Sequence, residues 1–126
     1  MPTKLIYEDL SYKIIGALFH VFNTIGWRYN EKIIQKAIAD ELAKLNINYQ
    51  REFYVAIKYQ GKKIGHHYFD FIIENQIVLE IKRGRHLLSK DFNQIKSYLK
   101  TSKLKLGILA LFTSLKVKIA RIANIY

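Results

Sequence analysis

The sequence predicts an α/β domain in which helices pack on a mixed β-sheet. Two segments near the start of the chain repeat apolar residues at steps of three and four, which is typical of amphipathic helices. The middle of the chain alternates apolar and polar residues and is rich in aromatic and β-branched types, which is typical of strands. A meander of three strands, then a helix, then a buried strand favours a mixed sheet covered by helices.

The first two predicted helices span Glu8–Gly26 and Asn30–Ile47. The apolar face of the first helix comprises Leu10, Ile14, Leu18, Val21, Phe22 and Ile25, and that of the second comprises Ile34, Ala37, Ile38, Leu42 and Leu45. Gly26 is a typical residue for a helix end, and Asn30 is a typical N-cap.

The remaining elements follow in the order α-α-β-β-β-α-β. The three strands of the meander are Tyr49–Tyr59, Lys62–Ile73 and Gln76–Lys82, the third helix is Ser89–Ser102, and the last strand is Lys103–Thr113. That last strand is apolar from Leu106 to Phe112 with only Gly107 interrupting, so we expect it to be buried on both faces. The tail from Ser114 onward fits either a short helix or an edge strand.

Length and composition favour one intracellular domain over residues 1–126. The chain has 126 residues and is 50% hydrophobic, which is enough for a modest core. It has no cysteine, which excludes disulfides, thiolate zinc sites and cysteine-ligated iron–sulfur clusters. The amino terminus is acidic where a signal peptide needs an apolar stretch, and no long apolar run lacks charge. We therefore expect a cytoplasmic protein with no membrane partner.

The charge balance points to a polyanionic partner. The chain has 21 Lys and Arg against 10 Asp and Glu, a formal net charge of +11. Nucleic acid is the commonest partner of so basic a domain. A lysine-rich surface without a specific partner is the alternative, and an anionic membrane is disfavoured because no segment is both strongly basic and cleanly amphipathic.

Charged residues in the hairpin Phe69–Gly84 carry the main functional hypothesis. If the hairpin is centred on Asn75, Asp70 and Glu80 are cross-strand partners, and Lys82 shares a face with Glu80. Two like charges placed opposite each other destabilise a sheet unless a cation lies between them. Mg²⁺ prefers one or two carboxylates with water and phosphate oxygens, and a lysine beside it can orient the attacking water. The alternative is a solvent-exposed face on which the lysine pairs with the acids.

Three further residues extend this hypothesis. Gln94 and Tyr98 are four apart on the third helix, so they share a face and can contact phosphate or water. Alternatively, Tyr98 belongs to the core and Gln94 is an exposed helix residue. Glu31 is either a further metal ligand or a first-turn acid favoured by the helix dipole.

Basic and histidine residues flank the hairpin. The stretch after the third strand comprises Lys82, Arg83, Arg85, His86 and Lys90, which we expect to contact the phosphate backbone. A solvated loop is the alternative. The adjacent His66 and His67 point to opposite faces of a strand, so a shared metal ion is disfavoured and we expect a surface pair.

The order Asp70, Glu80-Ile81-Lys82 and Gln94-Ile-Lys-Ser-Tyr98 resembles the PD-(D/E)XK nuclease superfamily. The Gln-x-x-x-Tyr element is similar to that of its RecB-like and Cas4-like exonuclease branch. Over nearly its whole length the chain resembles the small GxxExxY proteins. The segments that carry this resemblance are KIIGALFHVFNTIG, YNEKIIQKAIADEL and VAIKYQGKKIGHHYFDFIIENQIVLEIK. Departures are Phe69 at a proline position, Ile34 for the tyrosine of the name motif and Phe22 for a histidine.

The resemblance implies a restriction-endonuclease-like core, a central mixed sheet flanked by helices, that hydrolyses phosphodiester bonds with Mg²⁺ or Mn²⁺. By position, Asp70 and Glu80 would bind the metal together with the Ile81 backbone carbonyl. Lys82 would be the catalytic lysine. Gln94 and Tyr98 would contact DNA or the site, and Glu31 matches the glutamate of the name motif.

Three functions stay open on the sequence. The first is a metal-dependent nuclease, acting on DNA rather than RNA. The second is a nucleic-acid-binding module that keeps the fold without turnover, which the altered first-helix motif favours. The third is an assembly subunit in which Leu106–Phe112 and the apolar tail form an interface. A homodimer is compatible with all three.

Overall fold

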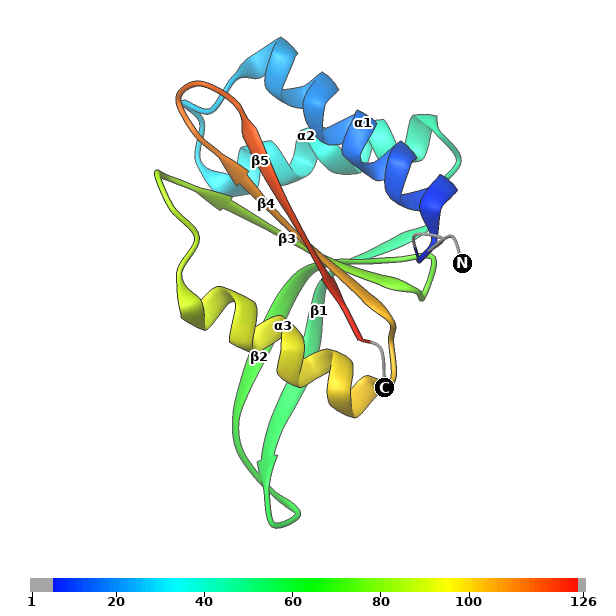
Figure 1. Ribbon diagram of the computed structural model, residues 1–126, viewed down its shortest axis with the longest axis vertical. Helices are drawn as coiled ribbons and strands as arrows, with labels where there is room; N and C mark the ends of the chain where they lie inside the picture. Colours follow the sequence, from blue (N-terminus) through cyan, green and yellow to red (C-terminus); the bar gives the residue numbers. More distant parts are fainter. Residues whose placement is uncertain (1–5, 125–126) are drawn as a thin grey trace, which may run out of the picture.

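A five-stranded mixed sheet lies between helices on both faces. The computed structural model describes residues 6–124. Its elements are α1 (Glu8–Ile25), α2 (Glu31–Lys44), β1 (Tyr49–Tyr59), β2 (Lys62–Ile73), β3 (Ile77–Arg83), α3 (Ser89–Ser102), β4 (Leu106–Phe112) and β5 (Val117–Ala123). The strands are ordered β1-β2-β3-β4-β5, with α1 and α2 on one side of the sheet and α3 on the other (Figure 1). This confirms the predicted α/β class and the restriction-endonuclease-like architecture.

Only β3 and β4 run parallel, and all other neighbours are antiparallel. The parallel pair requires a crossover, which α3 supplies. Along β3, Ile77, Leu79 and Ile81 pack toward α1 and α2, whereas Val78 packs toward α3. Burial on both faces explains why β3 and β4 are apolar at nearly every position.

The strand β4 is buried along its whole length, between β3 and β5. An interface role for Leu106–Phe112 is therefore wrong, because both edges of this strand are paired and both faces are covered. Gly107 is required in β4 by close packing. A Cβ built there would lie 2.4 Å from Cγ2 of Ile95 on α3.

The helices α1 and α3 have the predicted bounds to within one residue, but α2 ends at Lys44, before the predicted Ile47. Asn46 adopts a left-handed conformation with a φ of 58°. Its N–H donates to the Ala43 carbonyl, and the N–H of Ile47 donates to the Leu42 carbonyl. These two bonds close the helix in a Schellman motif and direct the buried Ile47 toward the sheet.

The carboxyl-terminal tail, for which helix and strand were both open, forms the edge strand β5 antiparallel to β4. Ile125, Tyr126 and the first five residues of the predicted domain lie outside the described residues. Within residues 6–124, no helix is long and apolar enough to cross a membrane.

The hairpin of β1 and β2 extends beyond the rest of the sheet as an arm on the side of α3 (Figure 1). Near its base the pairing passes from Arg51–Phe71 to Phe53–Phe69, and Glu52 between them has a φ of 50°. Phe71 packs toward α1 and α2, whereas Phe69, two residues earlier, packs toward α3. The strand β2 therefore turns at Asp70, a distortion of the kind that often re-aims side chains beside functional sites.

Candidate active site at the divergence of β2 and β3

Asp70 and Glu80 lie together where the β2–β3 ladder opens. The ladder pairs Phe71 with Leu79, which confirms the register predicted from a turn centred on Asn75. At the next pair of positions, Asp70 and Glu80, hydrogen bonds to side chains take the place of the backbone hydrogen bonds of the ladder. The backbone N–H of Asp70 donates to Oε1 of Glu80 at 2.6 Å, and the N–H of Ile81 donates to Oδ2 of Asp70 at 2.7 Å. Each carboxylate is thus held by the backbone of the opposite strand.

The Glu80 carboxylate is buried, and the Asp70 carboxylate is half-buried. Glu80 is 3% exposed, so the alternative of a solvent-exposed face is wrong for this residue. Burial, and then the negative charge of Glu80, raise the pKa of Asp70 from 3.8 to about 7, although the Ile81 N–H and Lys82 oppose the shift. Glu31 raises the same pKa further. Burial and the neighbouring acids therefore both favour the neutral form of Asp70 in the metal-free site.

This donor set fits a divalent cation bound largely by water and substrate. Among residues 6–124, no group of three or more His, Cys, Asp or Glu side chains is arranged to hold a metal ion. Mg²⁺, however, typically takes only one or two carboxylates and completes its shell with waters and phosphate oxygens. Asp70 and Glu80 supply two hard oxygen ligands, and a bound cation would offset the repulsion between them.

Lys82 is held beside the carboxylates by an acid from α3. Its Nζ lies 3.8 Å from Oδ1 of Asp91, which is buried in the first turn of the helix. The other oxygen of Asp91 accepts a hydrogen bond from the N–H of Leu88 at 2.9 Å, so the carboxylate also caps α3. The start of α3 thereby positions the lysine on the same side of the sheet as Glu80.

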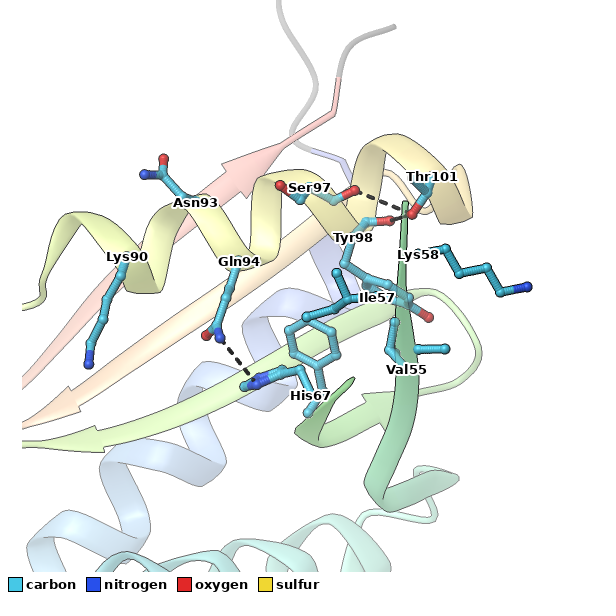
Figure 2. Close-up of a pocket in the computed structure, with 12 residues that line it drawn as sticks. Val55, Ile57, Lys58, His67, Lys90, Asn93, Gln94, Ser97, Tyr98 and Thr101 are labelled. Carbon is cyan, nitrogen blue, oxygen red and sulfur yellow. Dashed lines mark hydrogen bonds between the residues drawn. The ribbon is translucent and has the colours of Figure 1, made fainter. Parts of the chain in front are cut away.

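His67 contacts the site, so the expectation of a surface pair is wrong for this residue. His66 is exposed and stacks on Tyr54 at a centroid distance of 5.5 Å. His67 lies on the opposite face of β2, with Nε2 3.4 Å from Oε2 of Glu80 and Nδ1 3.3 Å from the amide nitrogen of Gln94 (Figure 2). An amide nitrogen can only donate, so in this arrangement Nδ1 of His67 accepts from Gln94.

Glu31 joins α2 to the end of β3. Its Oε2 accepts a hydrogen bond from the N–H of Arg83 at 3.1 Å, and Glu31 and Asp70 line the same pocket of about 470 Å³. Nε of Arg83 donates to the Trp27 carbonyl at 2.6 Å, and its guanidinium lies over the Trp27 ring. Glu31 is therefore near the carboxylate pair, and Arg83 anchors the segment between α1 and α2.

The structure places the other predicted residues around this centre. Tyr98 is half-buried against Phe69, with ring centroids 4.8 Å apart, and burial raises the pKa of its hydroxyl. Lys90 is exposed on the first turn of α3, and Arg85 is exposed in the loop before it. Gln94 and Tyr98 project toward β2 from the same face of α3 (Figure 2).

Comparison with known proteins assigns the family. The model of the PD-(D/E)XK nuclease superfamily matches residues 8–122. The chain belongs to this superfamily. Nucleases of the superfamily generally use divalent metal ions. No curated protein matches the chain.

A solved structure supports the fold independently. The protein described as SSO0001 superimposes with a TM-score of 0.57 at 23% identity over 94% of this chain. The chain spans 60% of the length of that protein. At this identity the likeness concerns the fold alone.

Sequence patterns did not reveal two of the contacts at this site. Asp91 was missed as the partner of Lys82, although an acid in a first helical turn is a common cap. His67 was missed because the distance between Glu80 and the arm depends on the turn of β2 at Asp70. Its position three residues before Asp70, on the inward face of the strand, is the one signal that could have identified it.

Proposed function

We propose that this protein is a metal-dependent nuclease that hydrolyses phosphodiester bonds of DNA. The observation that carries the proposal is the pair of carboxylates, buried Glu80 and half-buried Asp70, inserted in the opened β2–β3 ladder beside Lys82. Membership of the PD-(D/E)XK superfamily supports the reaction class. The net charge of +11 supports a polyanionic substrate.

Asp70 and Glu80, with the Ile81 backbone carbonyl, are the proposed ligands of Mg²⁺ or Mn²⁺. Such an ion, when bound, generates a nucleophile from water at neutral pH and neutralises charge on the phosphate. Glu31 is the proposed accessory acid, since it already shares a pocket with Asp70 and raises its pKa. Nε2 of His67 lies 3.4 Å from the second oxygen of Glu80.

Lys82 is the proposed catalytic lysine. Its ammonium is held near Asp91 at 3.8 Å, which is close enough to fix its position without a tight ion pair. From there it can orient the attacking water and offset the charge that develops on the phosphate oxygens. A residue that acts on developing charge is expected to affect turnover more than binding.

Basic and polar groups around the carboxylate pair are the proposed contacts to the DNA strand. Arg85 and Lys90 are exposed beside the start of α3, where they can neutralise phosphates. Gln94 and Tyr98 lie on the face of α3 that approaches His67 and Phe69. On the opposite side of the sheet, Arg83 is the proposed contact to the DNA strand, because it lines a pocket together with Asp70.

We also propose the finer assignment to the GxxExxY proteins and the RecB-like and Cas4-like branch, with residues 1–126 as one domain. The Gln94-to-Tyr98 spacing and the location of Glu31 beside Asp70 support it. The departures at Ile34 and Phe22 do not alter the carboxylate pair, because both residues pack in or against the core between the sheet, α1 and α2.

A cleavage assay tests the proposal. End-labelled single-stranded, duplex and branched DNA are incubated with protein and Mg²⁺, Mn²⁺ or EDTA. We expect products only with a metal ion, and at least a ~100-fold loss of rate in Lys82→Ala. Lys96→Ala, an exposed lysine on α3 away from the site, is the matched control and retains activity. Salt-sensitive DNA binding without products would instead favour a binding module that retains the fold.

A further inference from the structure

A groove between the β1–β2 arm and α3 adjoins the carboxylate pair. It has a volume of about 520 Å³. Val55 and Ile57 from β1 face Gln94 and Tyr98 from α3 across it (Figure 2). Grooves of roughly 300–1,000 Å³ are typical of sites for small molecules or single chemical groups.

The walls of the groove are aromatic and aliphatic. Phe69 and Tyr98 form one side, with their rings inclined at 38° and their centroids 4.8 Å apart. Ile57 is 45% exposed, which leaves an apolar surface open to solvent on the arm. A flat aromatic group would remove this surface from water and stack on the Tyr98 side.

The rim of the groove is polar. Asn93 and Ser97, both exposed, lie along α3 at its edge. Amide and hydroxyl groups both donate and accept hydrogen bonds, which matches the mixed donors and acceptors on the edge of a nucleobase.

Position and charge tie the groove to the proposed reaction. His67 lines the groove and also lies 3.4 Å from Oε2 of Glu80, so the groove and the carboxylates are separated by a single side chain. Lys90 and Lys58 also line it, from α3 and from the arm, where they can contact the phosphates on either side of a bound base. The lining therefore combines an apolar interior with cations, as single-strand binding sites do.

We propose that this groove binds an unpaired nucleobase of the substrate strand, next to the phosphate that is cleaved. The inference rests on the proposed nuclease function and specifies its substrate class, a single strand or a frayed end. A base within a duplex is stacked and paired, so it can enter the groove only after it has been extruded. Base stacking on protein aromatics is strong enough to give a single strand at least a ~10-fold advantage over duplex.

The test is equilibrium binding in EDTA, where no strand is cleaved. An oligonucleotide that carries the fluorescent base 2-aminopurine is titrated with protein, both as a single strand and annealed to its complement. Anisotropy of an end label gives the two affinities, and the 2-aminopurine signal reports stacking of the base. We expect at least ~10-fold tighter binding of the single strand, with quenching of the base.

Two variants at one position make the test specific. Ser97→Trp places a large ring over the groove, whereas Ser97→Ala leaves the groove open. We expect Ser97→Trp to lose the single-strand preference and the quenching but to bind duplex like the wild type, and Ser97→Ala to keep both. Ile57→Glu, which introduces a negative charge on the arm side, is expected to behave like Ser97→Trp.

Failure of the base-binding groove can be distinguished from failure of the proposed nuclease function. Equal affinity of the wild type for both forms, or an unchanged preference in Ser97→Trp and Ile57→Glu, would overturn the base-binding groove and leave the proposed nuclease function standing. Absence of binding to either form would contradict the proposed function, and with it this inference.

Discussion

Replacing Asp70 by asparagine is expected to stabilise the metal-free protein at alkaline pH while it removes activity. In the folded chain the pKa of Asp70 rises from 3.8 to about 7, because the carboxyl is buried and faces Glu80. Each tenfold change in proton affinity is worth about 1.4 kcal/mol. The ionised carboxylate therefore costs the fold on the order of 4 kcal/mol at a pH well above 7.

The sign of the pH dependence follows from the same shift. Because the folded pKa lies above the unfolded value, the folded state binds more protons between about pH 4 and pH 7. Its stability is greatest below this range and falls as the pH rises through it. Asparagine at position 70 can still accept the hydrogen bond from the Ile81 N–H, but it carries no charge. The gain from Asp70→Asn should thus be large at pH 8 and close to zero at pH 4.

Urea denaturation in EDTA at pH 8, 6 and 4 provides the measurement. Asp40→Asn, at an exposed residue of α2, is the matched control and should change stability little at any pH. Adding Mn²⁺ should stabilise the wild type but not Asp70→Asn. The reasoning is refuted if Asp70→Asn destabilises the metal-free protein at pH 8, or if its effect is the same at all three pH values.

Three further predictions concern the scaffold and the charged surface. Gly107→Ala should cost roughly 1–3 kcal/mol in urea denaturation, because the new Cβ would meet Ile95 Cγ2 at 2.4 Å and Val78 Cγ1 at 3.2 Å; a neutral effect would contradict the packing. Asn30→Ala should cost about 1 kcal/mol by removing the α2 cap, in which Asn30 Oδ1 accepts from the Ile33 N–H, whereas Asn30→Asp should restore it. Lys90→Ala should reduce the slope of log affinity against log salt for DNA by about 1, and Lys36→Ala on the far side of α2 should not.

The sequence predicted the strand register because the turn at Asn75 and the apolar alternation on both sides of it leave few alternatives. A shift of one residue would place the buried Phe71 and Leu79 on the wrong face. The bounds of β1, β2 and α3 were also predicted correctly, because strong periodicity and turn residues coincide in these segments. The adjacency of Asp70 and Glu80 followed from the register alone.

Other features depend on tertiary contacts that a single sequence does not display. The tail forms β5 because β4 offers it a free edge, not because its own pattern excludes a helix. His67 reaches Glu80 only because β2 turns at Asp70, opposite the left-handed Glu52. Lys82 and Asp91 meet because the loop between β3 and α3 folds back over the sheet, which no local propensity specifies.

The most direct test of the account is whether Asp70 and Glu80 together hold a divalent cation. Calorimetric titration of the metal-free protein with Mn²⁺ at pH 8 measures this without reference to any substrate. We expect one ion per chain in the wild type and a loss of at least ~10-fold in affinity in Glu80→Gln, because a neutral amide is a weaker ligand for a hard cation. Equal Mn²⁺ affinity in the wild type and in Glu80→Gln, or no binding to either, would contradict the proposed metal centre.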